Sequence, residues 1–215
     1  MVGQGGTTLA ERSALAEAIK QITRALSLLS TLPGTPALRR EHIRFQVALL
    51  TPLQHIKGYA APDTKAAAEQ ARLLIDQAEA LGEPPEDPLL LFSVLYGLWV
   101  ANYAAFNGDA LRELAAQFLA LAINKGGTVP LMLGHRVMAT SLVYTGDIAE
   151  GRTHYDQAVA LYDPATHLPL ATRFGQDMRV VILCQRSLAL WLLGYPQSAL
   201  YLRGRVTRTM LKVSS

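Results

Sequence analysis

The residues best suited to chemistry in this sequence are five histidines, one cysteine and a few acidic side chains. No two histidines stand four residues apart, and no HExxH motif occurs among them: His42, His55, His135, His154 and His167. A zinc site needs three or four such ligands in one place. We therefore expect no metal site, and we interpret His154 as a packing or surface residue of a helix.

Cys184 is the single cysteine of the chain, so no intrachain disulfide can form. It follows an apolar run, Val181, Ile182 and Leu183, which predicts a buried and unreactive thiol within a helix. Reduced cysteine is typical of the cytoplasm, where we expect the protein. Residues 1–8 lack the pattern of a secretory signal, and we expect them to be disordered.

Patterns that bind phosphate or activate a nucleophile are missing from the sequence. It contains neither a GxxxxGK[ST] loop nor a GxSxG elbow, and Gly3, Gly5 and Gly6 follow no predicted strand. Asp147 and Glu150 begin a predicted helix, where carboxylates stabilise the positive end of the helix dipole. We therefore expect no catalytic residue, no metal and no cofactor, and the chain is predicted not to be an enzyme.

The composition predicts a folded protein, because half the residues are hydrophobic, 17% are charged and the mean hydropathy is +0.18. The net charge of +3 is spread along the chain, except for a basic C-terminal cluster of Arg203, Arg205, Arg208 and Lys212. Such a cluster can attract nucleic acid or anionic lipid, but a solvated tail is the favoured interpretation. We expect no nucleic-acid partner.

An uncharged stretch over residues 88–108 raises the question of a membrane span. Polar Ser93 and Asn102 interrupt it, and its flanks, Asp87 and Asp109, are acidic rather than basic. These features favour a buried helix of a repeat, so no membrane span is expected.

Proline or aspartate opens most apolar-periodic stretches, and glycine closes them. The first stretch, residues 9–29, predicts an amphipathic helix. Short connections then predict antiparallel helical hairpins over about residues 36–82, 88–125, 130–162 and 172–208. The first hairpin begins with a helix reaching about residue 53, and residues 163–169 are rich in turn formers. We expect one helical repeat domain over residues 9–208, followed by a frayed basic tail over residues 209–215.

The hairpins share a turn motif, with Gly108, Gly146 and Gly194 in equivalent places. Residues 138–164 resemble the tetratricopeptide (TPR) consensus at these positions: Ala139, Leu142, Tyr144, Gly146, Asp147, Tyr155, Ala158 and Pro164. The segments around Ser187 and Ala101 fit the same frame. The resemblance implies an all-α, right-handed α-α superhelix of about four hairpins plus an N-terminal helix, which binds a protein or peptide in its concave groove.

The repeat frame places the first helix of each hairpin on the concave face. The expected partner contacts are Asn102, Phe106, Arg136, Thr140, Tyr144 and Trp191, with Cys184 and Leu188 near them. Alternatively, Phe106, Leu188 and Trp191 fill the seams between repeats, which leaves Asn102 and Arg136 as the better contact candidates.

A narrower resemblance covers about residues 10–200. The chain is similar to the C-terminal repeat region of bacterial class III adenylate/guanylate cyclases, in which a cyclase domain and an AAA-type ATPase domain precede the helical tail. The matching phrases are residues 32–40, 57–62, 80–88, 146–151, 161–164, 170–177 and 190–196. The resemblance implies a regulatory or partner-binding tail without cyclase catalytic residues.

Two functions follow from that resemblance. The first is a non-catalytic interaction module, interpreted as a truncated copy or fragment of such a protein. The alternative is cyclic-nucleotide synthesis, attributed through the parent cyclase. Since the match fades from about residue 201, we also expect the apolar end of the repeat array to self-associate.

Overall fold

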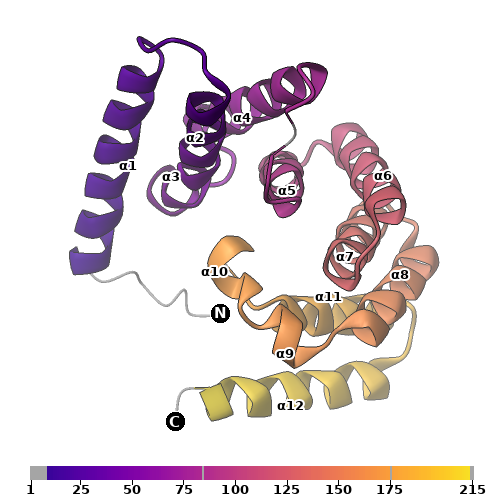
Figure 1. The fold of residues 1–215 in the computed structure, drawn as a ribbon. Coiled ribbons are helices and arrows are strands. Elements are labelled where there is room, and N and C mark those ends of the chain that lie inside the picture. Colours follow the sequence, from indigo (N-terminus) through magenta and orange to yellow (C-terminus); the bar gives the residue numbers. More distant parts are fainter. Residues whose placement is uncertain (1–8, 84, 175, 214–215) are drawn as a thin grey trace. The chain divides into compact units, whose positions relative to one another are not determined.

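The structure is a computed structural model that describes residues 9–83, 85–174 and 176–213, with the backbone alone for residues 172 and 205–213. Residues 1–8, which we expected to be disordered, lie outside this range. So do residues 214–215, the end of the expected tail. Within it the regular structure is entirely helical (Figure 1). The helices are α1 (Leu9–Leu29), α2 (Pro36–Ala48), α3 (Leu50–Lys57), α4 (Pro62–Ala80), α5 (Leu89–Ala104), α6 (Gly108–Lys125), α7 (Thr128–Tyr144), α8 (Ile148–Leu161), α9 (Pro164–His167), α10 (Leu170–Phe174), α11 (Met178–Leu192) and α12 (Pro196–Val213).

Residue contacts divide the chain into two compact units, Met1–Ala105 and Phe106–Ser215. The boundary falls inside the hairpin expected over residues 88–125. The first unit therefore contains α1 to α5 and the second contains α6 to α12.

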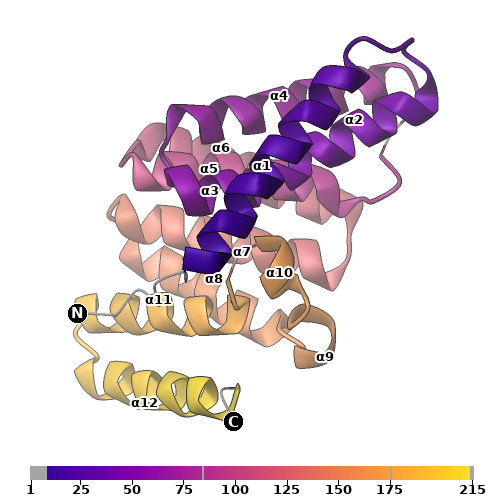
Figure 2. The same ribbon diagram turned by 90° about the vertical axis from the view of Figure 1, so that its left-hand side faces the viewer.

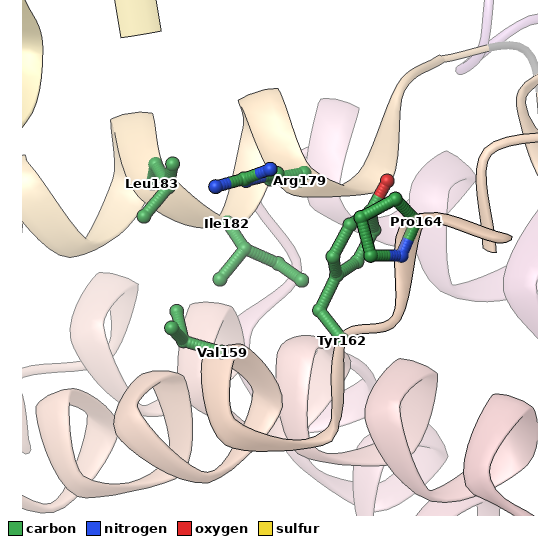
Figure 3. A pocket seen from close by; sticks show the side chains of 6 residues that line it. All are labelled: Val159, Tyr162, Pro164, Arg179, Ile182 and Leu183. Carbon is green, nitrogen blue, oxygen red and sulfur yellow. The ribbon is translucent and has the colours of Figure 1, made fainter. Parts of the chain in front are cut away.

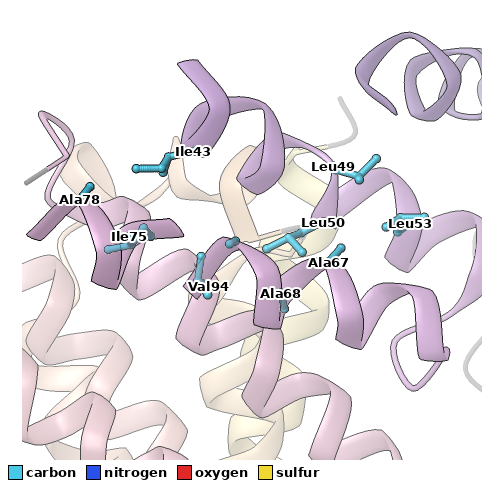
Figure 4. Close-up of a cluster of buried hydrophobic side chains, with 10 residues drawn as sticks. Ile43, Leu49, Leu50, Leu53, Ala67, Ala68, Ile75, Ala78 and Val94 are labelled. Atoms are coloured by element: carbon cyan, nitrogen blue, oxygen red, sulfur yellow. The ribbon is translucent and has the colours of Figure 1, made fainter. Parts of the chain in front are cut away.

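The core of the first unit forms where α2, α3, α4 and α5 meet (Figure 4). Its larger members include Ile43, Leu50, Ile75 and Val94, and the α4 side is lined by small alanines: Ala67, Ala68, Ala71 and Ala78. Small side chains let helices approach closely. Each buried isoleucine or leucine contributes roughly 1.5–3 kcal/mol. Helix α1 lies along α2 and α3 (Figure 2) and buries no residue fully, so it covers this core without forming it.

The expected helix over residues 36–53 is broken, because α2 ends at Ala48 and α3 begins at Leu50. Pro52 explains the break. It has no N–H to donate to the carbonyl of residue 48, and its ring clashes with that carbonyl in a continuous helix.

In the second unit α7 packs between α6 and α8. The α7–α8 hairpin turns at Gly146, whose φ of 106° suits glycine. The two helices approach so closely that a Cβ built on Gly151 lies 2.6 Å from Val143 Cγ2 and 2.8 Å from the Ala139 carbonyl oxygen. The glycine here is therefore required by packing.

The last hairpin begins later than expected. Residues 163–177 contain α9 and α10, and α11 begins at Met178 rather than near residue 172. Asp177 caps α11, because its carboxylate accepts the N–H groups of Arg179 at 2.8 Å and Val180 at 3.2 Å. Helix α12 runs beside α11 and continues to Val213, past the end expected near residue 208 (Figures 1 and 2).

None of the helices within the described ranges is long and apolar enough to cross a membrane. The uncharged stretch forms α5, which has 16 residues and buries Phe92, Tyr96 and Trp99 among others.

Candidate partner-binding surface

Helix α11 carries apolar side chains on two faces. One face packs into the unit through Met178, Ile182 and Ala189, which are all buried. The other consists of Cys184, Leu188 and Trp191, which lie on one line of the helix and are exposed to solvent. We call these three residues the α11 stripe. Leu188 keeps 39% and Trp191 keeps 56% of its surface accessible, so within this structure the stripe does not act as core.

The expectation of a buried Cys184 is wrong, because the side chain is exposed. Its surroundings still desolvate the sulfur in part and raise the pKa of the Cys184 thiol. A raised pKa keeps the sulfur as a protonated thiol near neutral pH, so the residue is exposed without being activated as a nucleophile.

The α7 residues expected on the same surface separate into two groups. Tyr144 is 43% exposed, and its hydroxyl donates to the side-chain oxygen of Gln185 on α11 at 3.3 Å. Gln185 adjoins Cys184, so this hydrogen bond joins Tyr144 to the α11 stripe. Tyr144 and the α11 stripe together form the candidate surface.

Arg136 and Thr140 lie inside the α7–α8 hairpin instead, with 4% and 2% of their surface exposed. The Thr140 hydroxyl lies 2.8 Å from the hydroxyl of Tyr155 on α8 and 3.1 Å from the Arg136 carbonyl oxygen. Burial raises the pKa of Tyr155 far above its usual value, while the Thr140 hydrogen bond and the Arg136 charge oppose the shift. Tyr155 is therefore a neutral, structural hydrogen-bonding group.

Asn102 and Phe106 are not brought onto this surface by any described contact. Asn102 belongs to the first unit, where its side-chain amide donates to the Leu98 carbonyl oxygen at 2.9 Å. Phe106 is the first residue of the second unit and is 88% exposed, with a left-handed φ of 56°.

Ion pairs join the helices around the candidate surface. The Arg186 guanidinium on α11 donates from Nε to Asp156 Oδ1 on α8 at 2.5 Å, and Arg152 Nε lies 3.4 Å from the other oxygen of that carboxylate. Arg112 on α6 pairs with Asp147 at the start of α8. Arg186, on the same helix as the α11 stripe, is thus paired within the unit, and the stripe itself offers apolar and aromatic area.

A histidine pair in the α7–α8 hairpin was not anticipated from the sequence. His135 Nδ1 lies 2.9 Å from His154 Nδ1, and the ring centroids are 5.2 Å apart. Desolvation lowers the pKa of both imidazoles. The charge of His154 lowers the pKa of His135 further, whereas Glu150 opposes the shift at His154. No sequence signal marked this pair, because its members stand on different helices.

The second unit also contains a small cavity of about 190 Å³ beside α8, α9 and α11 (Figure 3). It is lined by Val159, Tyr162, Pro164, Arg179, Ile182 and Leu183. The Arg179 guanidinium carbon lies 5.7 Å from the Tyr162 ring centroid, a cation–π arrangement. Ligand pockets usually measure about 300–1,000 Å³, so this cavity is too small for a drug-sized molecule.

Among the described residues, no group of three or more histidine, cysteine or acidic side chains is arranged to hold a metal ion.

Comparison with solved structures shows the fold. The chain is similar to two crystal structures of the nearly identical TPR-like repeats of a Podosopora anserina protein described as a kinesin light chain. For the first, a structure of a single-substitution variant, the TM-score is 0.62 at 16% identity, covering 93% of this chain and 88% of that one. For the second the TM-score is 0.60 at 17% identity, with the same coverage.

No family model matches the sequence, and no curated protein matches it. The class is therefore defined by the fold: an all-α chain of TPR-like helical repeats, as expected from the turn motif. The narrower resemblance to the cyclase tail finds no counterpart in these comparisons.

Proposed function

We propose that this chain is a non-catalytic interaction module that binds a protein or peptide segment through Tyr144 and the α11 stripe. The observation that carries the proposal is the exposure of Leu188 and Trp191 on a helix whose other face is already buried. A helix that is apolar on both faces is stable when both faces are covered. Exposed tryptophan and tyrosine are also the side chains that contribute most to protein interfaces.

The chemistry of the surface suggests what it binds. Its side chains are apolar and aromatic, and Arg186 of the same helix is paired with Asp156. We infer that the partner presents an apolar or amphipathic segment, such as one face of a helix, rather than a strongly charged one.

The cyclase-like sequence phrases support a further part of the proposal, which is that the module serves as the regulatory tail of a cyclase-type signalling protein or descends from one. The proposed compartment is the cytoplasm, because a single cysteine cannot form an intrachain disulfide.

The binding proposal is tested by selecting peptides that bind the purified chain from a random displayed library and measuring their affinity by calorimetry. Trp191→Ala and Leu188→Ala should each weaken binding. For Trp191→Ala the expected loss of binding free energy is about 2 kcal/mol, or roughly 30-fold in affinity. Leu73→Ala is the matched control, since Leu73 is an exposed leucine of α4 in the other unit, at 49%. Equal affinities for wild type and Trp191→Ala would reject the surface.

The competing function, cyclic-nucleotide synthesis, has its own experiment. The purified chain is incubated with ATP or GTP and magnesium or manganese, and cyclic products are measured. The interaction module should form none above the protein-free background. Turnover that scales with protein concentration would show that the chain is an enzyme and would reject the proposal of a non-catalytic module.

Self-association is proposed for the apolar surface around the α11–α12 turn. Four large side chains are exposed by 52–69% there: Leu192, Tyr195, Leu200 and Tyr201. Exposed apolar patches of this kind favour contact with another protein surface. Sedimentation should show a concentration-dependent dimer that Leu200→Lys with Tyr201→Lys abolishes, while a monomer at high concentration would reject the contact.

A further inference from the structure

The histidine pair has a geometry that packing alone does not require. His135 on α7 and His154 on α8 are half-buried, stand 19 residues apart in sequence and direct the same ring atom, Nδ1, at each other across 2.9 Å. At this distance one Nδ1–H donates to the other Nδ1, whose lone pair accepts. Two nitrogen donors on two packed helices are therefore held together by the hairpin.

The separation also suits a bound metal ion. Imidazole nitrogens bind Zn²⁺ at about 2.0–2.1 Å, so two of them at right angles around one ion of that size lie about 2.9 Å apart. Imidazole is a preferred ligand of Zn²⁺, Ni²⁺ and Cu²⁺, and among divalent first-row metals affinity is highest for Cu²⁺. The ring planes are inclined by 35°. To bind such an ion, each Nδ1 lone pair must turn by about 45° from the nitrogen–nitrogen line toward a common point beside it.

We propose that His135 and His154 form a two-histidine site for a divalent late transition-metal ion, best satisfied by Cu²⁺, with water at the remaining coordination positions. The expectation of no metal site was based on the absence of an i,i+4 histidine pair and of an HExxH motif, whereas these two histidines stand 19 residues apart on different helices. On binding, the ring with hydrogen on Nδ1 carries it on Nε2 instead, so both Nδ1 lone pairs face the ion. No proton is released from the neutral pair and no electron is transferred.

One nearby charge favours a cation at His154. Glu150 stands one turn before His154 on α8, and its charge stabilises positive charge at that ring. Arg152, the nearby cation on the same helix, is paired with Asp156. A neutral imidazole has one ring nitrogen with a free lone pair, which is the form that coordinates a metal ion.

The test uses the full chain without a histidine tag. Cu²⁺ is titrated against a weak competing chelator, and the nitrogen couplings of the bound ion are measured by electron paramagnetic resonance. Wild type should bind one equivalent coupled to two imidazole nitrogens. His135→Gln and His154→Gln should each weaken binding at least roughly tenfold. His55→Gln, a change at an exposed histidine of α3, is the matched control and should leave affinity unchanged.

Circular dichroism checks that the variants keep their helical content. If a variant unfolds, the electron paramagnetic resonance spectrum of the wild-type protein tests the site by itself, because it gives the number of imidazoles bound to the ion. Coupling to fewer than two imidazoles, unchanged affinity in His135→Gln and His154→Gln, or loss of binding in His55→Gln would each overturn the site.

Discussion

Arg39, at the start of α2, donates two hydrogen bonds to the carboxylate of Glu83, which follows α4. They run from Nε to Oε2 at 2.9 Å and from Nη2 to Oε1 at 2.7 Å. The residues stand 44 positions apart, so this paired contact joins the beginning of α2 to the segment after α4.

The Arg39–Glu83 contact predicts a pH-dependent stability. The Arg39 hydrogen bond lowers the pKa of Glu83, so the folded state holds that carboxylate ionised more readily than the unfolded chain does. The stabilisation is complete above the unfolded-state pKa of about 4.3 and is lost as the pH falls through the lower folded-state pKa. Glu83→Gln should lower the Tm at pH 7, and the difference from wild type should shrink in strong acid.

Glu86→Gln provides the control for that experiment. Glu86 lies 3.4 Å from Arg40, but its side chain is 81% exposed, and such pairs contribute little. Thermal melts followed by circular dichroism from pH 2 to pH 7 compare the three proteins. A Glu83→Gln difference that stays constant across this range would refute the linkage.

A methyl group added at Gly151 should destabilise the α7–α8 hairpin. The new Cβ would overlap Val143 and the Ala139 carbonyl, so Gly151→Ala should cost about 1–3 kcal/mol, although alanine is the better helix former. At Gly204 in α12 a Cβ meets no atom within 4 Å, and Gly204→Ala should stabilise by about 0.5–1 kcal/mol. Urea denaturation measures the stability of both variants. A Gly151→Ala protein as stable as wild type would contradict the close approach of α7 and α8 at this glycine.

The buried hydroxyls of Thr140 and Tyr155 in the same hairpin predict that removing one costs more stability than removing the other. Tyr155→Phe should cost about 1 kcal/mol, because Thr140 keeps its bond to the Arg136 carbonyl oxygen. Thr140→Val should cost about 1–3 kcal/mol, since it leaves the Tyr155 hydroxyl buried without that partner. The double variant should be less destabilised than the sum of the two, which a double-mutant cycle detects. Strict additivity would show that the hydroxyls do not interact.

Replacing Phe106 with a residue that tolerates a positive φ should stabilise the protein, because Phe106 holds a strained backbone conformation. Its φ of 56° costs an L-residue roughly 1–2 kcal/mol, and asparagine tolerates this region best after glycine. Phe106→Asn should therefore raise the free energy of unfolding by about 0.5–1 kcal/mol. Phe106→Ala removes the exposed ring but keeps the strain, so it should change stability by less than about 0.5 kcal/mol. Equal stability of the Asn and Ala variants would count against the strain.

Helix positions were well predicted wherever a local signal marks both ends. Residues 9–29 form α1 as expected, and Gly146 turns the chain between α7 and α8. The break at Leu49 was missed because the apolar pattern continues through Pro52, whose effect falls on a carbonyl four residues earlier. The short helices in residues 163–177 were missed because proline and aspartate also occur in turns.

The candidate surface was predicted less well, and for a physical reason. A repeat frame gives the line of a helix but not what covers it. It therefore treats Thr140 and Tyr144 alike, whereas in the structure Thr140 is buried against Tyr155 of α8 and Tyr144 is exposed. Helix α11 is apolar on both faces, so its periodicity could not decide which face is buried, and Cys184 was assigned to the wrong one. The histidine pair depends on tertiary contact alone.

The three pairs of helices that pack most extensively are consecutive along the chain: α7 with α8, α6 with α7, and α11 with α12. Native structure can therefore form by closing short loops, each at a small entropic cost, without waiting for distant segments to meet. We expect refolding to be fast for a chain of this length. Pulling on its ends should release it hairpin by hairpin rather than in one event.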